Sequence, residues 1–377
     1  MAIATLAPLF FLLPAVLGSK PRCFEFEHPI HVSLTVPKFS VPDFSSSIES
    51  TAFLTASISR NANLSSLVVG ETKIDRSFNI HFQYCEPDDC KRSPEVLQVL
   101  SHGVGFDHSY WDFGGKEYNY ITSATAHGYA TLSYDRLGVG RSALADADPY
   151  SEIQVPTQVA ILAEISSLLR AGNLSRKIGT LPKKLVHVGH SFGSLITNGL
   201  VAASPALADG IVLTGFSHNI SWTPLFELCL GFELARSNNP ARFHGYDSGY
   251  LTWGNQYDNQ CAFYTYPFFD SRVLGEAERR KAPFAISELL SFASIPLTAP
   301  NFTRPVLLIS GQSDLPFCGG DCTGVFDGPA SVSRFVFPAA SPFASYIHPN
   351  TGHALNLHHN ASAAYEVIHK FVKEHVN

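Results

Sequence analysis

The stretch KLVHVGHSFGS, residues 184–194, joins an apolar, β-branched run to a serine that stands between two glycines. The run from Leu185 to Val188 is too short for a helix and is typical of a buried parallel strand. From Phe192 onward apolar residues recur at helical spacing, so a helix follows at once. Ser191 lies at the corner in a Gly-x-Ser-x-Gly pattern, where the glycines leave room for a sharp turn that pushes the hydroxyl outward. The stretch therefore predicts a nucleophilic serine.

Strands alternate with helices on both sides of this stretch. Two segments rich in β-formers, 24–39 and 77–87, predict antiparallel or edge strands that begin a sheet. Further strands are expected at 96–100, 130–134, 211–214 and 306–310, and helices at 118–127 and 158–171. Such alternation forms right-handed crossover units, so the sequence predicts an α/β fold with a mostly parallel central sheet flanked by helices.

Composition narrows the class of partner. The chain has 377 residues, 45% of them hydrophobic, which is enough for one large α/β domain or two smaller ones. Charged residues make up only 15% and the net charge is −6, so no basic surface is available for nucleic acid. We therefore expect a small, neutral or apolar substrate.

The first 18 residues, MAIATLAPLFFLLPAVLG, resemble a secretory signal peptide cleaved before Ser19. The segment lacks an early Lys or Arg, so a signal anchor is the alternative, although Pro14 and the short apolar run oppose a membrane span. We expect a secreted protein, residues 19–377, without stable membrane insertion after removal of the signal.

Sequons and cysteines agree with a secretory route. Asn-x-Ser/Thr motifs occur at Asn63, Asn173, Asn219, Asn301 and Asn360. All seven cysteines lie after the signal, which favours disulfides, and no paired Cys-x-x-Cys pattern indicates zinc. Connectivity stays open; the spacing favours Cys85 with Cys90, Cys318 with Cys322 and Cys229 with Cys261, leaving Cys23 over.

The strand and helix alternation lapses between Gly215 and Pro305. This stretch is too rich in aromatic residues for a passive connection, with Phe226, Phe232, Phe243, Tyr246, Tyr250, Trp253, Tyr257, Phe263, Tyr264, Tyr266, Phe268 and Phe269. We expect residues 220–300, approximately, to form a cap over the carboxyl edge of the sheet, whose aromatic side chains roof an apolar pocket. The alternative is a locally packed excursion that does not contact substrate.

A serine nucleophile needs a general base and an acid that orients the base. Asp314 follows the strand at 306–310, at the sheet edge where catalytic groups of α/β folds gather. His353 follows in a Gly-His turn before the last helix. The interval of 39 residues between them leaves Asp321 and Asp327 as weaker alternatives for the acid.

Three other histidines lie close to His353 in the sequence. His348 precedes a proline, which favours an extended backbone at the end of the last strand, and it is the second choice for the base. His358 and His359 precede a sequon and are expected to face solvent.

These motifs, in this order, resemble the α/β-hydrolase superfamily over residues 75–375, approximately. GHSFG, the SHGVG loop, YDRLGVGRS, GQSD and TGH all occur in the order that the fold requires. The resemblance implies Ser191 as nucleophile, Asp314 as orienting acid and His353 as base. It also implies an oxyanion hole formed by the backbone N–H groups of Val104 and Phe192. The tract 135–142 is more often a structural turn in this family, and a catalytic role for it is the less favoured alternative.

The resemblance limits the chemistry to acyl transfer from Ser191, because relatives with alkyl-enzyme chemistry carry an aspartate at the elbow. We expect a secreted, capped serine hydrolase that acts on a small or medium apolar ester or lactone without metal or organic cofactor. The alternatives are an acyltransferase or cyclisation enzyme of natural-product biosynthesis and, less favoured, a binding protein that has lost catalysis. The sequence does not indicate an oligomeric state.

Overall fold

The computed structural model describes residues 20–88, 94–144, 146–179, 181–325 and 331–376. The expected signal peptide at 1–18, Cys90 and Asp327 lie outside these residues. Within them, no helix is both long enough and apolar enough to cross a membrane.

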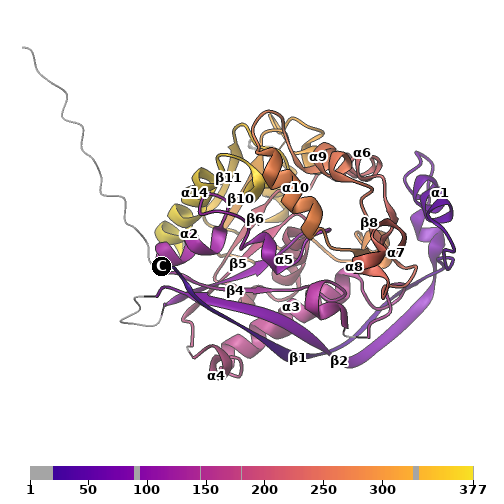
Figure 1. Cartoon of the computed structure of the whole chain (residues 1–377). Coiled ribbons are helices and arrows are strands. Elements are labelled where there is room, and N and C mark those ends of the chain that lie inside the picture. Colours follow the sequence, from indigo (N-terminus) through magenta and orange to yellow (C-terminus); the bar gives the residue numbers. More distant parts are fainter. Residues whose placement is uncertain (1–19, 89–93, 145, 180, 326–330, 377) are drawn as a thin grey trace, which may run out of the picture.

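An eight-stranded sheet with the order β1-β2-β4-β3-β5-β6-β10-β11 forms the centre of the molecule (Figure 1). The first two strands are antiparallel to each other and β2 is antiparallel to β4, whereas the other neighbours are parallel. The strand bounds are β1 Arg22–Phe39, β2 Val68–Glu86, β3 Val96–Ser101, β4 Ala130–Tyr134, β5 Lys184–His190, β6 Gly210–Thr214, β10 Val306–Gly311 and β11 Phe343–His348. The predicted α/β class and mostly parallel sheet are confirmed.

Two pairs of packed helices flank the sheet. In one pair α2 (Tyr120–Ala126) contacts α14 (Ala361–His375), and in the other α3 (Val155–Arg170) contacts α5 (Phe192–Ala203) (Figure 1). The inner strands β3 to β6 and β10 are almost entirely buried, because helices cover both faces of a parallel sheet. This buried sheet is the rigid platform for the candidate site at its carboxyl edge.

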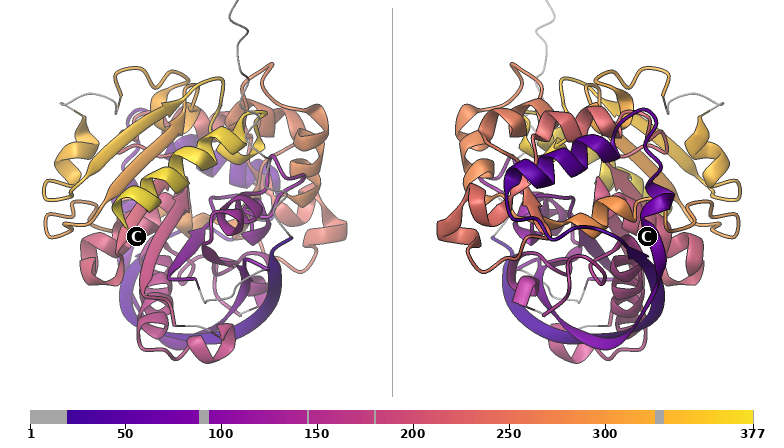
Figure 2. Two further views of the ribbon diagram at one scale, coloured as in Figure 1. Left: turned by 90° about the vertical axis from the view of Figure 1, so that its left-hand side faces the viewer. Right: turned by 90° about the vertical axis from the view of Figure 1, so that its right-hand side faces the viewer.

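The hairpin β1–β2 is much longer than the inner strands. At its tip it carries α1 (Ser47–Ser57) and the short 3₁₀ helix η1 (Leu64–Leu67). Figures 1 and 2 show α1 far from the sheet centre, beside the segment that joins β6 to β10. We call residues 20–86 the N-terminal hairpin.

The chain between β6 and β10 forms a separate layer with a small sheet of its own, ordered β7-β8-β9. We call residues 215–305 the inserted segment. Its elements are α6 Thr223–Leu230, β7 Glu233–Leu234, α7 Ala235–Asn238, α8 Pro240–Phe243, β8 Tyr250–Thr252, α9 Gln256–Phe263, α10 Ser271–Arg280, β9 Phe284–Ala285 and α11 Ile286–Leu290. An aromatic-rich insertion therefore interrupts the α/β alternation, as expected.

Three disulfides are present in the described residues. Two of the expected pairs, Cys229–Cys261 and Cys318–Cys322, are confirmed. The expected pair Cys85–Cys90 is wrong, because Cys85 is bonded to Cys23. These two residues are directly paired in the register of β1 and β2, which brings them together across 62 residues of sequence.

Candidate active site

Ser191 lies on the turn between β5 and α5. Its backbone has φ 55° and ψ −117°, a combination that residues with a side chain rarely adopt. Steric contacts explain the flanking glycines: a Cβ at Gly189 would lie 2.5 Å from the carbonyl oxygen of Gly193, and a Cβ at Gly193 would overlap the carbonyl of Ser101. The turn is therefore as sharp as the sequence pattern indicates, and it holds the serine at the carboxyl edge of the sheet.

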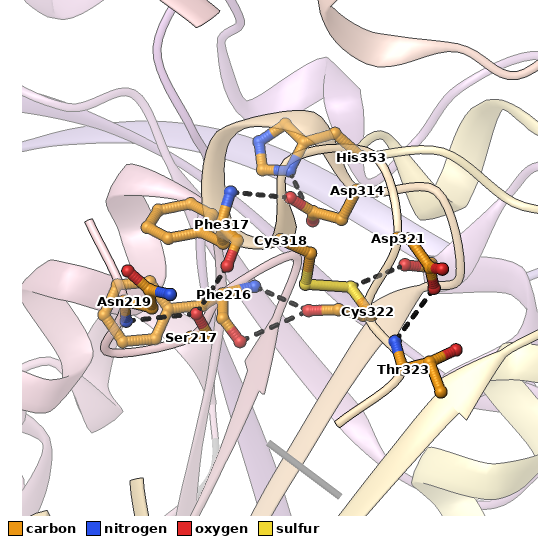
Figure 3. Close-up of a disulfide and its surroundings, with 12 residues drawn as sticks. Phe216, Ser217, Asn219, Asp314, Phe317, Cys318, Asp321, Cys322, Thr323 and His353 are labelled. Carbon is orange, nitrogen blue, oxygen red and sulfur yellow. Dashed lines mark hydrogen bonds and ion pairs between the residues drawn. A yellow bond between two sulfur atoms is a disulfide. The ribbon is translucent and has the colours of Figure 1, made fainter. Parts of the chain in front are cut away.

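The imidazole of His353 joins Ser191 to Asp314. Its Nε2 lies 2.8 Å from the hydroxyl oxygen of Ser191, and its Nδ1 lies 2.7 Å from Oδ2 of Asp314. The second carboxylate oxygen of Asp314 accepts a hydrogen bond of 3.1 Å from the backbone N–H of Phe317 (Figure 3). Asp314 and His353 are fully buried and Ser191 is 5% exposed. The structure thus brings the three residues selected from the sequence into one chain of hydrogen bonds.

A short loop closed by Cys318–Cys322 follows Asp314 (Figure 3). The backbone N–H of Gly320 donates to the carbonyl of Asp314 at 2.9 Å, so the loop folds back onto this residue. Asp321, one alternative for the acid, is exposed on the far side of the disulfide and accepts from the N–H of Thr323 at 3.0 Å. Asp327 lies outside the described residues.

Of the other histidines, His348 ends β11 as expected and its Nε2 lies 3.1 Å from the carbonyl oxygen of Asn360. His359 is exposed, also as expected. His358 is not: it is buried, contrary to the expected solvent-facing position.

His358 holds the turn that carries His353. Its Nε2 accepts hydrogen bonds from the backbone N–H groups of Gly352, at 3.0 Å, and Thr265, at 3.1 Å, while its Nδ1 donates to the carbonyl of Ala354. Burial lowers the pKa of His358 to about 4, so the ring stays neutral and keeps the lone pair that accepts these bonds. No local sequence pattern indicates this role, since Thr265 belongs to the distant inserted segment.

Val104 and Phe192, the two residues expected to supply the oxyanion hole, both line the pocket beside Ser191. Within the described residues, no hydrogen bond uses either N–H as a donor. The neighbouring His102 braces the first of the two loops, because its Nδ1 donates to the carbonyl of Gly103 and its Nε2 accepts from the N–H of Arg136 at 3.0 Å. Burial lowers the pKa of His102 to about 3, which keeps this acceptor available.

The tract 135–142 supports the site, although none of its hydrogen bonds or ion pairs among the described residues involves Ser191. The carboxylate of Asp135 accepts from the backbone N–H groups of His108, at 2.9 Å, and Arg141, at 2.8 Å. Arg136 forms a fully buried ion pair with Glu288 of α11 and lies 4.6 Å from the ring centre of Phe192. This ion pair fastens the inserted segment to the sheet beside the nucleophile.

The pocket beside Ser191 has a volume of about 30 Å³ and a mostly apolar lining. Of the twelve aromatic residues that the sequence analysis singled out, only Phe226 lines it. Most of the others are buried or half-buried and pack the inserted segment; Trp253, for example, is fully buried against Phe106 and Phe263. Tyr257 and Tyr266 are exposed. An aromatic roof over the pocket is therefore limited to Phe226 and to Phe292, which the sequence analysis did not select.

Two clusters of possible metal ligands occur in the described residues, and neither includes Asp314 or His353. One consists of Glu25, His81 and His108, and the other of Asp107, His108 and Asp135. In the first, Arg141 already pairs with the carboxylate of Glu25 at 2.7 Å. In the second, His108 Nδ1 lies 2.6 Å from Oδ1 of Asp135. Both clusters are therefore accounted for by contacts within the protein.

Comparison with known proteins agrees with this architecture. A sequence model of the Alpha/beta hydrolase family matches residues 98–365. No curated protein matches the chain in sequence. Similar solved structures include a thermophilic esterase from Thermogutta terrifontis, with 13% identity, TM-score 0.52 and coverage of 80% of this chain and 96% of that one. An enol-lactonase from Burkholderia xenovorans has 17% identity, TM-score 0.51 and coverage of 78% and 97%. A thermostable carboxyl esterase from Bacillus coagulans has 17% identity, TM-score 0.53 and coverage of 80% and 95%.

Proposed function

Because the chain belongs to the Alpha/beta hydrolase family, we propose that it is a secreted serine hydrolase that cleaves an apolar ester or lactone through an acyl-enzyme on Ser191. One observation carries the proposal: a buried chain of hydrogen bonds runs from the hydroxyl of Ser191 through both ring nitrogens of His353 to the carboxylate of Asp314. This arrangement allows the imidazole to take the serine proton while the carboxylate holds the ring in the required tautomer.

The reaction follows from these contacts. The oxygen of Ser191 attacks the carbonyl carbon of the ester as its proton passes to Nε2 of His353. The free N–H groups of Val104 and Phe192 then stabilise the negative oxygen of the tetrahedral intermediate. Collapse of this intermediate releases the alcohol, which takes the proton from His353. Water activated by the same nitrogen then attacks the acyl-enzyme, releases the acid and restores Ser191.

The pocket and the disulfides support the finer parts of the proposal. The mostly apolar lining beside Ser191 favours a substrate with an uncharged arm next to the ester. Three disulfides suit an oxidising compartment, in agreement with the signal-like N-terminus and the sequons.

Hydrolysis of a panel of p-nitrophenyl esters and lactones by the purified mature protein tests this proposal. We expect turnover of uncharged substrates, and Ser191→Ala should reduce it by about 10⁶-fold because the nucleophile is lost. The melting temperature should change little, since the hydroxyl is small and its loss leaves no large cavity. Turnover that survives in Ser191→Ala, or a faster reaction with anionic than with neutral esters of equal size, would contradict the proposal.

The same assay tests whether an alcohol, rather than water, accepts the acyl group from Ser191. An alcohol added in excess competes with water for the acyl-enzyme, and product analysis separates free acid from new ester. We expect the acid to dominate. New ester as the main product at low alcohol concentration would assign the protein to the acyltransferases instead.

A further inference from the structure

A second, much larger pocket adjoins the one at Ser191. It has a volume of about 410 Å³ and lies between the N-terminal hairpin and the inserted segment. Four side chains line both pockets, and we call them the neck: Thr223, Glu227, Leu289 and Phe292. The two pockets therefore share these residues as a common wall. Its volume falls within the range of about 300 to 1,000 Å³ that is common for small-molecule sites, whereas about 30 Å³ at Ser191 holds little more than the reacting group.

The outer wall of this pocket comes from the N-terminal hairpin. It is lined by Leu54 of α1, by Ile58 directly after that helix, by Ala62 in the following turn and by Leu64 of η1. The hairpin precedes residue 98, where the match to the family begins, so this wall lies outside the matched part of the chain.

Specific contacts fasten this wall to the inserted segment. The hydroxyl of Ser47 accepts from the backbone N–H of Leu234 at 3.3 Å, and Arg236 donates to the carbonyl of Phe44 at 3.1 Å. Figures 1 and 2 show α1 lying along the inserted segment rather than free in solvent. The pocket therefore lies between two parts of the chain that hold each other in place, and it is open to solvent on one side.

Glu227 is the only ionisable side chain, among the described residues, that lines either pocket. No hydrogen bond or ion pair joins its carboxyl group to another described residue, and burial raises its pKa to about 7. The other charged groups nearby are engaged or exposed: Glu49 bonds to Ser45, Glu233 to Asn238 and Glu288 to Arg136, and Arg60 faces solvent. Glu227 thus stands alone in an apolar passage.

We propose that the longer apolar arm of the substrate, acyl or alcohol, passes the neck and occupies the pocket behind the N-terminal hairpin, so that the hairpin sets the length preference and Glu227 makes it depend on pH. The substrate class is then an ester whose arm is a medium-length chain or a ring system. This inference rests on the proposed hydrolase function. At low pH Glu227 is neutral, and an apolar arm can lie beside it at little cost. At high pH Glu227 is charged, and a long apolar arm would remove water from its carboxylate, so binding of long arms is disfavoured.

Filling the pocket tests its role. Ala62→Trp is designed to place a large ring in the pocket. Ala52→Trp is a matched control, because Ala52 of α1 is also exposed but lines neither pocket. For each protein kcat/KM is measured with p-nitrophenyl acetate and decanoate, and with methyl and decyl acetate. We expect the long-to-short ratio to fall at least tenfold in Ala62→Trp for one of the two series, since each excluded methylene costs roughly a factor of four. The ratio should stay at the wild-type value in Ala52→Trp. An unchanged ratio in Ala62→Trp for both series would overturn the inference.

The pH dependence of the same ratio tests Glu227, because any titration of the triad affects both substrates and cancels. The wild-type ratio should fall several-fold as pH rises through about 7, and Glu227→Gln should give a flat ratio. A wild-type ratio that does not change with pH, or the same slope in Glu227→Gln, would remove the role of Glu227.

A binding measurement that needs no catalysis separates this inference from the proposed hydrolase function. In a Ser191→Ala background, calorimetry with decyl p-nitrophenyl ether, which cannot be cleaved, should show at least tenfold weaker binding when Ala62→Trp is added and unchanged binding with Ala52→Trp. If no ester is hydrolysed but this difference is found, the pocket stands and the hydrolase proposal fails. If esters are hydrolysed through Ser191 and the difference is absent, the hydrolase proposal stands and the inference fails.

Discussion

Two carboxyl groups of the inserted segment, Glu227 and Glu288, differ in the partners that their surroundings offer to the charged form. Glu288 is fully buried, but it pairs with Arg136 and accepts a hydrogen bond of 2.9 Å from Gln158. Burial raises the pKa of both groups, yet Glu227 has no partner that offsets this effect. Glu227 is half-buried, and a carboxylate in such a position without a protein partner lowers stability when it is charged, so we attribute its presence to a role in the passage that it lines.

Glu227 therefore makes folding stability depend on pH. Its pKa rises from 4.5 to about 7 on folding, so the folded state binds the proton more tightly than the unfolded chain, and stability falls as pH rises between these values. The cost above pH 7 is at most roughly 3 kcal/mol. Thermal unfolding should show that Glu227→Gln is several degrees more stable than wild type at pH 8 and no more stable at pH 4. Equal melting temperatures of wild type and Glu227→Gln at pH 8 would show that water or another group stabilises the charged form of Glu227, contrary to this prediction.

At the same scale, sequence spacing identified Ser191, Asp314 and His353 because each belongs to a local motif at the end of a strand or in a turn. The burial of His358 could not be read in this way. It depends on Thr265, which contacts His358 across 93 residues of the chain.

At the scale of elements, the loop closed by Cys318–Cys322 explains how Asp314 keeps its position at the end of β10. The loop folds back through hydrogen bonds from Gly320 to Asp314 and from Cys322 to Gln312, each 2.9 Å long. The disulfide spans only four residues, so it contributes less to stability than one that closes a long loop. Its main effect should be on the geometry of the acid.

This loop gives a prediction with a matched control. The double variant Cys318→Ala/Cys322→Ala should lose about 2 kcal/mol of unfolding free energy and at least tenfold in kcat/KM. The double variant Cys23→Ala/Cys85→Ala, which opens a loop of 62 residues at the sheet edge, should lose about 4 kcal/mol and retain more activity below its melting temperature. Denaturant unfolding and ester hydrolysis measure both. A larger loss of activity in Cys23→Ala/Cys85→Ala than in Cys318→Ala/Cys322→Ala would contradict the separate roles assigned to the two disulfides.

Short spacing predicted Cys318–Cys322 correctly and failed for Cys85. The difference is physical: a turn brings near neighbours together, but Cys23 meets Cys85 only through the register of two long strands. For the same reason the strands of the N-terminal hairpin were predictable from their β-formers, whereas the position of α1 over a pocket was not.

At the scale of the whole molecule, the five asparagines of the sequons differ in their exposure, which bears on the expected secretory route. Asn63, Asn173 and Asn301 are exposed, whereas Asn219 and Asn360 are half-buried. The side-chain N–H₂ of Asn360 donates to the carbonyl of Pro349 at 2.6 Å, and its oxygen accepts from Thr351. A glycan attaches through this same nitrogen, so the folded structure opposes modification at Asn360.

Expression in a eukaryotic secretory host should therefore give glycans at Asn63, Asn173 and Asn301 and little at Asn360. Peptide mapping after enzymatic deglycosylation in oxygen-18 water reports the occupancy of each site, because each released asparagine becomes a labelled aspartate, and the same map should begin at Ser19. Glycosylation confined to Asn360, or a secreted protein that retains residues 1–18, would contradict the expected processing.

The central claim is that Ser191 is a nucleophile activated by His353, and covalent trapping tests it most directly. The purified protein is treated with diisopropyl fluorophosphate, and the modified peptide is identified by mass spectrometry. We predict one adduct per chain, on Ser191, with a labelling rate that falls by several orders of magnitude in His353→Ala. Absence of an adduct from the folded wild-type protein, an adduct on another residue, or equal labelling of His353→Ala would contradict the account.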